Sequence, residues 1–120
     1  MVETERRRIQ RINLDHPVSG RLSGMRVALL DLSTIGARVE HTFPLPRGQG
    51  LRLDFVWEDE TITIQCEVAR CTAQKGAGPR TYVSGLQFVE PLGGSRAALL
   101  RMILAMVTRD LGKRKSSLEH

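Results

Sequence analysis

Apolar and polar side chains alternate with a period of two through the middle of this 120-residue chain, and this pattern most constrains its fold. Residues 51–57 and 62–68 each alternate, with an acidic turn at residues 58–60 between them. Such alternation is typical of strands that bury one face, and the turn predicts a hairpin. After Pro91 the apolar period lengthens to about 3.6, which predicts a helix. Its expected apolar stripe consists of Leu99, Leu100, Ile103, Met106 and Val107.

Other segments with strand character begin near Val18, Met25, Ala37 and Thr81, and loops rich in glycine or proline separate them. About six antiparallel strands followed by one helix predict a mostly β fold. We expect a small six-stranded antiparallel β-barrel with a C-terminal α-helix packed on it. A mass of 13.4 kDa fits one domain.

The sequence divides into three segments. Residues 1–16 are polar and charged and are expected to form a flexible N-terminal arginine arm, residues 17–112 the barrel and helix, and residues 113–120 a basic tail. Within the second segment, Ser95 is the expected N-cap of the helix and Gly112 its expected stop. The final Leu-Glu-His is similar to the start of an expression tag, so His120 carries no functional argument.

Composition limits the class of protein. Hydrophobic residues make up 41% of the chain, and no apolar run approaches the ~18–20 residues of a membrane-spanning helix. The start of the chain has no signal-peptide core, so a cytoplasmic location is expected. Cys66 and Cys71 fall in one predicted strand, about 16 Å apart, which is too far for a disulfide. Neither has metal-ligand spacing, and no metal or cofactor is expected.

A cluster of arginines near the start is the first candidate for binding. A guanidinium can fork onto a phosphate, or onto the O6 and N7 atoms of guanine. The formal net charge of +5 likewise favours anionic partners, such as phosphates, nucleic acid or an acidic membrane surface. The same run can equally be a solvated stretch of charge. The cluster contains Arg6, Arg7, Arg8 and Arg11.

Asp31, Ser33 and Gly36 form a second cluster, at the end of a predicted strand. An ionised aspartate only accepts, so it can take hydrogens from N1 and N2 of a guanine, whereas a serine both donates and accepts. Gly36 lacks a Cβ, which permits a positive φ or the close approach of a ligand. An ordinary turn is the alternative interpretation. His41 completes the residue types of a hydrolytic triad, but it is expected at the surface of a strand end, and no enzyme is predicted.

The two clusters together resemble the motifs of the PilZ domain family. Glu5 to Ile12 resembles the first motif, with Arg7 and Arg11 at its paired positions, and Asp31, Ser33 and Gly36 fit the second. The segment 82–88 resembles a late strand of the family, in which a glycine precedes an apolar-x-Phe pattern. The resemblance extends from about Glu5 to Leu111, which is nearly the whole chain.

The resemblance implies a receptor for cyclic di-GMP, a bacterial second messenger, in signal transduction. Arg7 and Arg11 would grip phosphate and the Hoogsteen edge of guanine, and Arg8 would add a phosphate or stacking contact. Asp31 and Ser33 would read a guanine base, while Gly36 would keep the turn open. Ligand binding would order the arm and change a surface that a downstream protein partner reads.

Two alternatives remain open at this point. One is a protein-interaction module of the same fold that does not respond to ligand. The other is a basic nucleic-acid-binding domain, although only 4% of the residues are aromatic and stacking platforms are therefore scarce.

Overall fold

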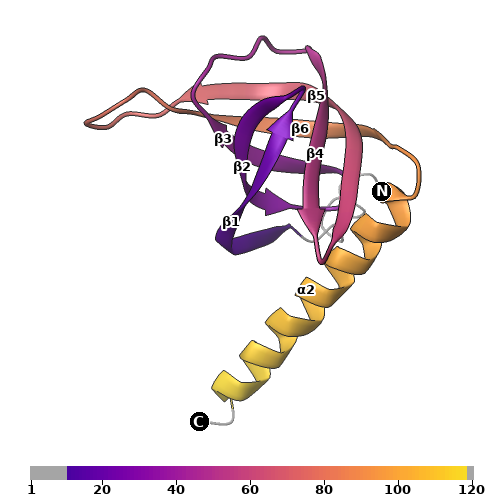
Figure 1. The fold of residues 1–120 in the computed structure, drawn as a ribbon. Coiled ribbons are helices and arrows are strands. Elements are labelled where there is room, and N and C mark those ends of the chain that lie inside the picture. Colours follow the sequence, from indigo (N-terminus) through magenta and orange to yellow (C-terminus); the bar gives the residue numbers. More distant parts are fainter. Residues whose placement is uncertain (1–10, 119–120) are drawn as a thin grey trace, which may run out of the picture.

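The computed structural model describes the backbone of residues 11–118 and the side chains of residues 11–109. Six antiparallel strands close into a barrel in the order β1-β2-β3-β6-β5-β4, and the helix α2 follows them (Figure 1). This confirms the predicted six-stranded barrel with a C-terminal helix. The elements are β1 (Ile12–Leu22), β2 (Met25–Leu32), β3 (Gly36–His41), β4 (Gly50–Trp57), β5 (Glu60–Ala73), β6 (Tyr82–Pro91) and α2 (Ser95–Leu118).

The barrel is filled by the apolar positions of the alternating strands. Strands β4 and β5 pair over their full alternating runs, so that Leu53 lies opposite Ile64 and both are fully buried. Their polar neighbours face outward, as a period of two requires. Cys66 also lies in this core, and burial raises the pKa of its thiol to about 12. Both cysteines are free.

Strand β1 begins earlier than the sequence predicted. Ile12 pairs with Leu32 and Asn13 with Asp31, and the register then shifts before Val18. Ile12 and Leu14 pack against the core, so residues 12–16, which were predicted to belong to a flexible arm, form part of the barrel. The rest of the predicted arm, including Arg6, Arg7 and Arg8, lies outside the described residues.

Helix α2 differs from the prediction at both ends. The Ser95 hydroxyl accepts a hydrogen bond from the Thr63 N–H on β5 (2.8 Å), so it fastens the helix to the barrel instead of capping it. At the other end the helix passes through Gly112 and continues to Leu118. A glycine inside a helix costs only about 1 kcal/mol relative to alanine, and the lysines and arginine that follow favour helix.

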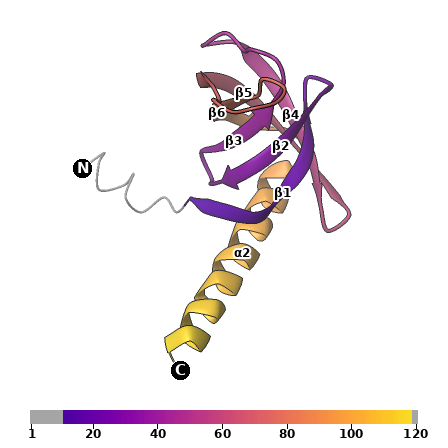
Figure 2. The same cartoon turned by 90° about the vertical axis from the view of Figure 1, so that its left-hand side faces the viewer.

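Only the first part of α2 packs on the barrel. Ala98, Leu99, Met102 and Ile103 are buried, whereas Leu100, which was predicted to belong to the packed stripe, is exposed. Met106 and Val107, which the sequence also placed in the packed stripe, are partly buried against the same core. Further along, the helix runs away from the barrel in both orientations (Figures 1 and 2). None of the described helices is long and apolar enough to cross a membrane.

Candidate functional site

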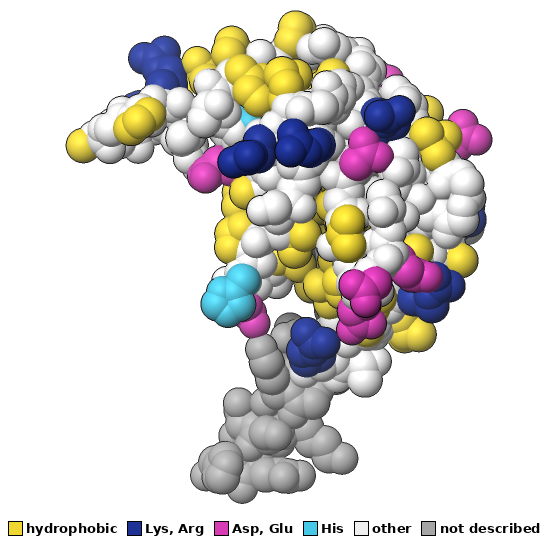
Figure 3. Space-filling view, viewed as in Figure 1, with side chains coloured by type: hydrophobic (Ala, Val, Ile, Leu, Met, Phe, Trp, Pro, Cys, Tyr) yellow, Lys and Arg dark blue, Asp and Glu magenta, His cyan; other side chains and the backbone are white. Residues whose placement is uncertain are grey.

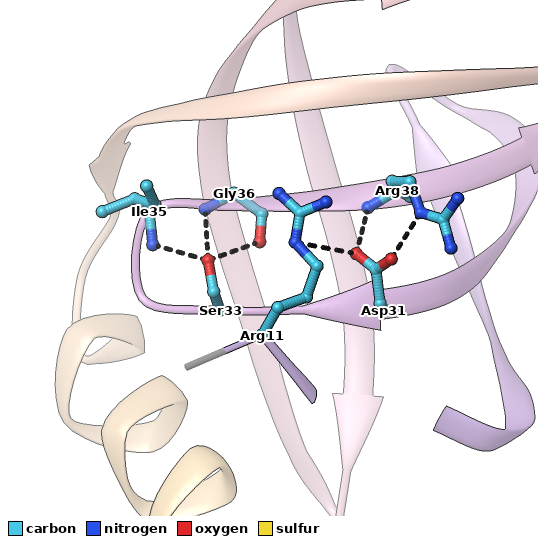
Figure 4. Close-up of polar contacts among 6 residues, drawn as sticks. All are labelled: Arg11, Asp31, Ser33, Ile35, Gly36 and Arg38. Carbon is cyan, nitrogen blue, oxygen red and sulfur yellow. Dashed lines mark hydrogen bonds and ion pairs between the residues drawn. The ribbon is translucent and has the colours of Figure 1, made fainter. Parts of the chain in front are cut away.

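The β2–β3 turn is held together by Ser33. Its hydroxyl accepts hydrogen bonds from the N–H groups of Ile35 and Gly36 (3.2 Å each) and lies 3.4 Å from the Gly36 carbonyl, to which it donates (Figure 4). The Ser33 N–H also donates to that carbonyl at 2.9 Å. The Ser33 hydroxyl is thus bonded to backbone groups of the turn, and the side chain is nearly fully buried. Ser33 therefore fixes the shape of this turn.

Gly36 is required by the barrel itself. Its φ does not lie in the left-handed region, so the turn does not demand a glycine for that reason. A Cβ at this position would instead overlap the carbonyl oxygen of Leu86 on the neighbouring strand β6. The lack of a side chain at Gly36 therefore allows strands β3 and β6 to approach each other closely.

Asp31 is a buried carboxylate between two arginines. Its side chain is 1% exposed, and it accepts hydrogen bonds from the Arg38 N–H (3.2 Å) and from the Arg38 Nε. Arg11 Nε lies 3.8 Å from Oδ1 on the other side. The two guanidinium-bearing side chains are about half exposed, at 48% and 58%. Of the roughly four acceptor sites of this carboxylate, Arg38 uses two, while Arg11 is held by charge attraction at the longer distance.

Strand register explains why these groups meet. Asn13 pairs with Asp31, Asp31 with Arg38, Arg38 with Gly85, and Gly85 with Arg70, so one row of directly opposed residues crosses β1, β2, β3, β6 and β5. Opposed residues share a face of the sheet, about 4.5–5.5 Å from one another. We call these five residues the cross-strand row. Its glycine leaves a gap between two arginines.

An open hollow of about 1150 Å³ lies over the Arg38, Gly85 and Arg70 part of this row, and Asp31 lies buried beside it, beneath Arg11 and Arg38. Its lining includes Ser33, Gly36 and Gly85, and no side chain fills the space above Gly85, where a Cβ would meet nothing within 4 Å. The structure thus brings Arg11, Asp31, Ser33 and Gly36 together, as predicted. It adds residues that the sequence reasoning missed, because outward-facing arginines on strands look like ordinary surface: Arg38, Arg70 and Gln87.

His41 lies apart from the hollow, at the other end of β3. It is buried and not at the surface as predicted, with Nδ1 2.6 Å from the Phe43 carbonyl and Nε2 2.7 Å from the Ser84 hydroxyl. Burial lowers the pKa of this imidazole. The residue types of a triad are therefore not gathered with Ser33 and Asp31. Among the described residues, no cluster of His, Cys, Asp and Glu could hold a metal ion.

Comparisons with known proteins agree with this architecture. The inhibitor of motility MotI/DgrA of Bacillus subtilis matches with a TM-score of 0.69 and 22% identity, over 90% of this chain and 52% of that one, so this chain spans about half of its length. The PilZ domain of YcgR from Escherichia coli, solved with c-di-GMP, matches with a TM-score of 0.65 and 18% identity. The match covers 92% of this chain and 98% of that one. The search of curated proteins gave no match. The PilZ domain model matches residues 5–105, so this chain belongs to the PilZ domain family.

Proposed function

We propose that this protein is a receptor for cyclic di-GMP, without catalysis of its own, that binds the dinucleotide in the hollow over the cross-strand row. The observation that carries the proposal is the buried carboxylate of Asp31, which holds Arg11 and Arg38 at the edge of that hollow. Family membership and the ligand of the YcgR domain support the same ligand class.

The chemistry of the hollow suits such a ligand. Cyclic di-GMP presents two phosphates and two guanines, and the lining offers Arg11, Arg38 and Arg70. Each guanidinium can bind a phosphate, or read the O6 and N7 atoms of a guanine. A volume of about 1150 Å³ leaves room for a dinucleotide, since sites for smaller molecules measure roughly 300–1,000 Å³.

The residues of the two motifs take different tasks in this proposal. Arg7, Arg8 and Arg11 supply cations from the N-terminal side, and the segment before Arg11 closes over the bound ligand. Asp31 orients Arg38 and Arg11, and because its side chain is only 1% exposed, it accepts from the N1 and N2 groups of guanine when these arginines move aside onto the ligand. Ser33 and Gly36 fix the turn that forms the rim.

Closure of the N-terminal segment links ligand binding to a downstream protein. Fixing each backbone residue costs about 1–2 kcal/mol, so the contacts to ligand must offset that cost. The covered surface then differs from the free one, and a partner protein can read the difference. We place this activity in the cytoplasm, with which two free cysteines agree.

Isothermal titration calorimetry of the full chain with cyclic di-GMP tests the proposal. Binding is expected, and Arg11→Ala and Asp31→Ala should each weaken it by roughly tenfold or more, since a bidentate contact to guanine is worth about 1–3 kcal/mol. Arg26→Ala is the matched control, because Arg26 lines a separate hollow beside β1 and β4. Absence of binding heat at tens of micromolar protein would favour the ligand-independent interaction module.

A competition titration separates the nucleic-acid alternative. Cyclic di-GMP should bind in the presence of excess arbitrary duplex DNA, with a modest dependence on salt. Displacement by DNA, with a steep loss of affinity as salt rises, would instead identify a nucleic-acid-binding domain.

A further inference from the structure

Two exposed leucines mark a face of α2 that the barrel does not use. Leu100 is 51% exposed and Leu104 is 67% exposed, and their spacing of four places them on one side of the helix. Leu99 and Ile103, each one position earlier, are buried against the barrel instead. Within the described part of the chain, nothing covers the two leucines. We call Leu100 and Leu104 the leucine stripe.

Arginines flank this stripe. At 100° per residue, Arg96 falls on one side of it and Arg101 on the other. Arg101 reaches back to Glu60 at the β4–β5 turn, with its Nη2 2.6 Å and 2.8 Å from the two carboxylate oxygens. This contact anchors the helix while leaving both side chains exposed. The stripe is thus an apolar strip on a helix fixed to the barrel, with one guanidinium on each side, of which that of Arg101 is already paired with Glu60.

The charge of the whole protein is concentrated in α2. By sequence, the helix carries a single acidic residue, Asp110, against the six cationic residues Arg96, Arg101, Arg109, Lys113, Arg114 and Lys115. This difference equals the formal net charge of the entire chain, +5, so the rest of the sequence is balanced. On the face of the molecule drawn in Figure 3, acidic and basic side chains are interspersed over the barrel, as expected for a balanced charge. An occupant of the stripe must therefore tolerate a strongly positive helix.

We infer that the leucine stripe of α2 is a docking surface for an acidic amphipathic helix of a partner protein. Such a helix inserts apolar side chains at i, i+3, i+4 and i+7 between Leu100 and Leu104, and its carboxylates face the flanking arginines. This inference rests on the proposed function in one respect, since it assigns the partner surface that a receptor requires.

The other two occupants fit less well. A second copy of this chain would place two helices of the same strong positive charge side by side, which is repulsive. An anionic membrane would attract the charge, but helices that lie in a membrane surface bury a broad apolar face of residues such as Trp, Phe and Leu. The sequence of α2 contains no Trp, Tyr or Phe, and the exposed apolar strip is narrow.

A peptide titration tests the inference in the absence of cyclic di-GMP. The probe is a synthetic three-heptad peptide with leucine at positions a and d and glutamate at e and g, where the glutamates keep it from pairing with itself. The full chain should bind it, and a peptide with lysine in place of glutamate should not bind. The double variant Leu100→Glu/Leu104→Glu should bind at least tenfold more weakly. Val56→Glu, at an exposed apolar position of β4, should bind as the parent does.

Several results would overturn the inference. The first is that the acidic peptide does not bind, and the second is that the double variant binds it as well as the parent does. The third is that the stripe supports self-association, or binding to phosphatidylglycerol vesicles, while the peptide does not bind. If the double variant fails to fold by circular dichroism, Leu100→Ser/Leu104→Ser replaces it. Calorimetry of the parent chain with cyclic di-GMP keeps the two proposals apart: if the parent binds cyclic di-GMP but not the acidic peptide, the result counts against the docking surface alone. If the parent binds the acidic peptide through the leucine stripe but does not bind cyclic di-GMP, the result counts against the ligand site alone.

Discussion

Replacement of Asp31 by asparagine tests whether this carboxylate organises the site. Asp31→Asn keeps the size of the side chain but turns one acceptor oxygen into an NH₂ group. Arg38 presents two donors, its backbone N–H and its Nε, to the two oxygens of Asp31. In either orientation of the amide, one of these donors therefore faces another donor, and Arg11 loses its charged neighbour.

The expected loss of stability follows from these contacts. Hydrogen bonds to a charged group contribute about 1.5–3 kcal/mol. Because the Arg38 side chain is 48% exposed, water can take over part of its lost hydrogen bonding in the variant. We expect the free energy of unfolding to fall by about 1.5 kcal/mol, which lowers the melting temperature by about 5–10 °C in a domain of this size. Thermal unfolding followed by circular dichroism measures the change.

A double-mutant cycle on ligand affinity completes this test. If Asp31 acts through Arg38, removing the Arg38 side chain already removes that part of the effect of Asp31. The double variant Asp31→Asn/Arg38→Ala should then lose less affinity for cyclic di-GMP than the sum of the two single losses. Affinities from calorimetry give the coupling. Fully additive losses, together with an unchanged melting temperature for Asp31→Asn, would refute the organising role.

The remaining predictions concern three other positions. Gly36→Ala should lower the free energy of unfolding by about 1–3 kcal/mol in chemical denaturation, because the new Cβ meets the Leu86 carbonyl, whereas Gly85→Ala should leave stability nearly unchanged; equal losses would contradict this. Arg70→Ala should weaken cyclic di-GMP binding by roughly tenfold in calorimetry while the melting temperature stays constant, and an unaltered affinity would remove Arg70 from the site. Burial lowers the pKa of His41 below its unfolded value of 6.5, so the unfolded chain takes up a proton first as the pH falls. Stability should therefore decrease below about pH 6.5, and melting curves of His41→Gln should lack that part of the decrease; parallel curves for both proteins would disprove it.

The barrel could be predicted because burial on one face of a strand imposes a local pattern. Leu53 and Ile64 alternate with polar residues for that reason, and both are buried where the pattern placed them. The boundaries could not be predicted as well. Ile12 joins the sheet through pairing with Leu32, which is a contact distant in sequence. Gly112 is only a weak signal for the end of a helix, and the helix continues past it.

The candidate site was predictable only where residue type and motif coincide. Asp31 and Arg11 could be singled out from the sequence, and the structure brings them together. Arg38 and Arg70 could not, because nothing local distinguishes them from other exposed arginines. Their significance comes from register, since both lie opposite Gly85 on either side of β6. Gly36 was singled out as clearance for a ligand, and the structure shows that a side chain there would meet the backbone of β6.

The central claim is that the cross-strand row is a binding site for cyclic di-GMP. The most direct measurement is a titration of the full, isotope-labelled chain with cyclic di-GMP, followed by amide resonances in NMR. Saturable shifts are expected for Arg11, the β2–β3 turn, Arg38, Gly85 and Arg70, while the amides of Arg26 and Val56 stay in place. No shifts at tens of micromolar protein with ligand in excess, or shifts confined to residues outside the hollow, would contradict the claim.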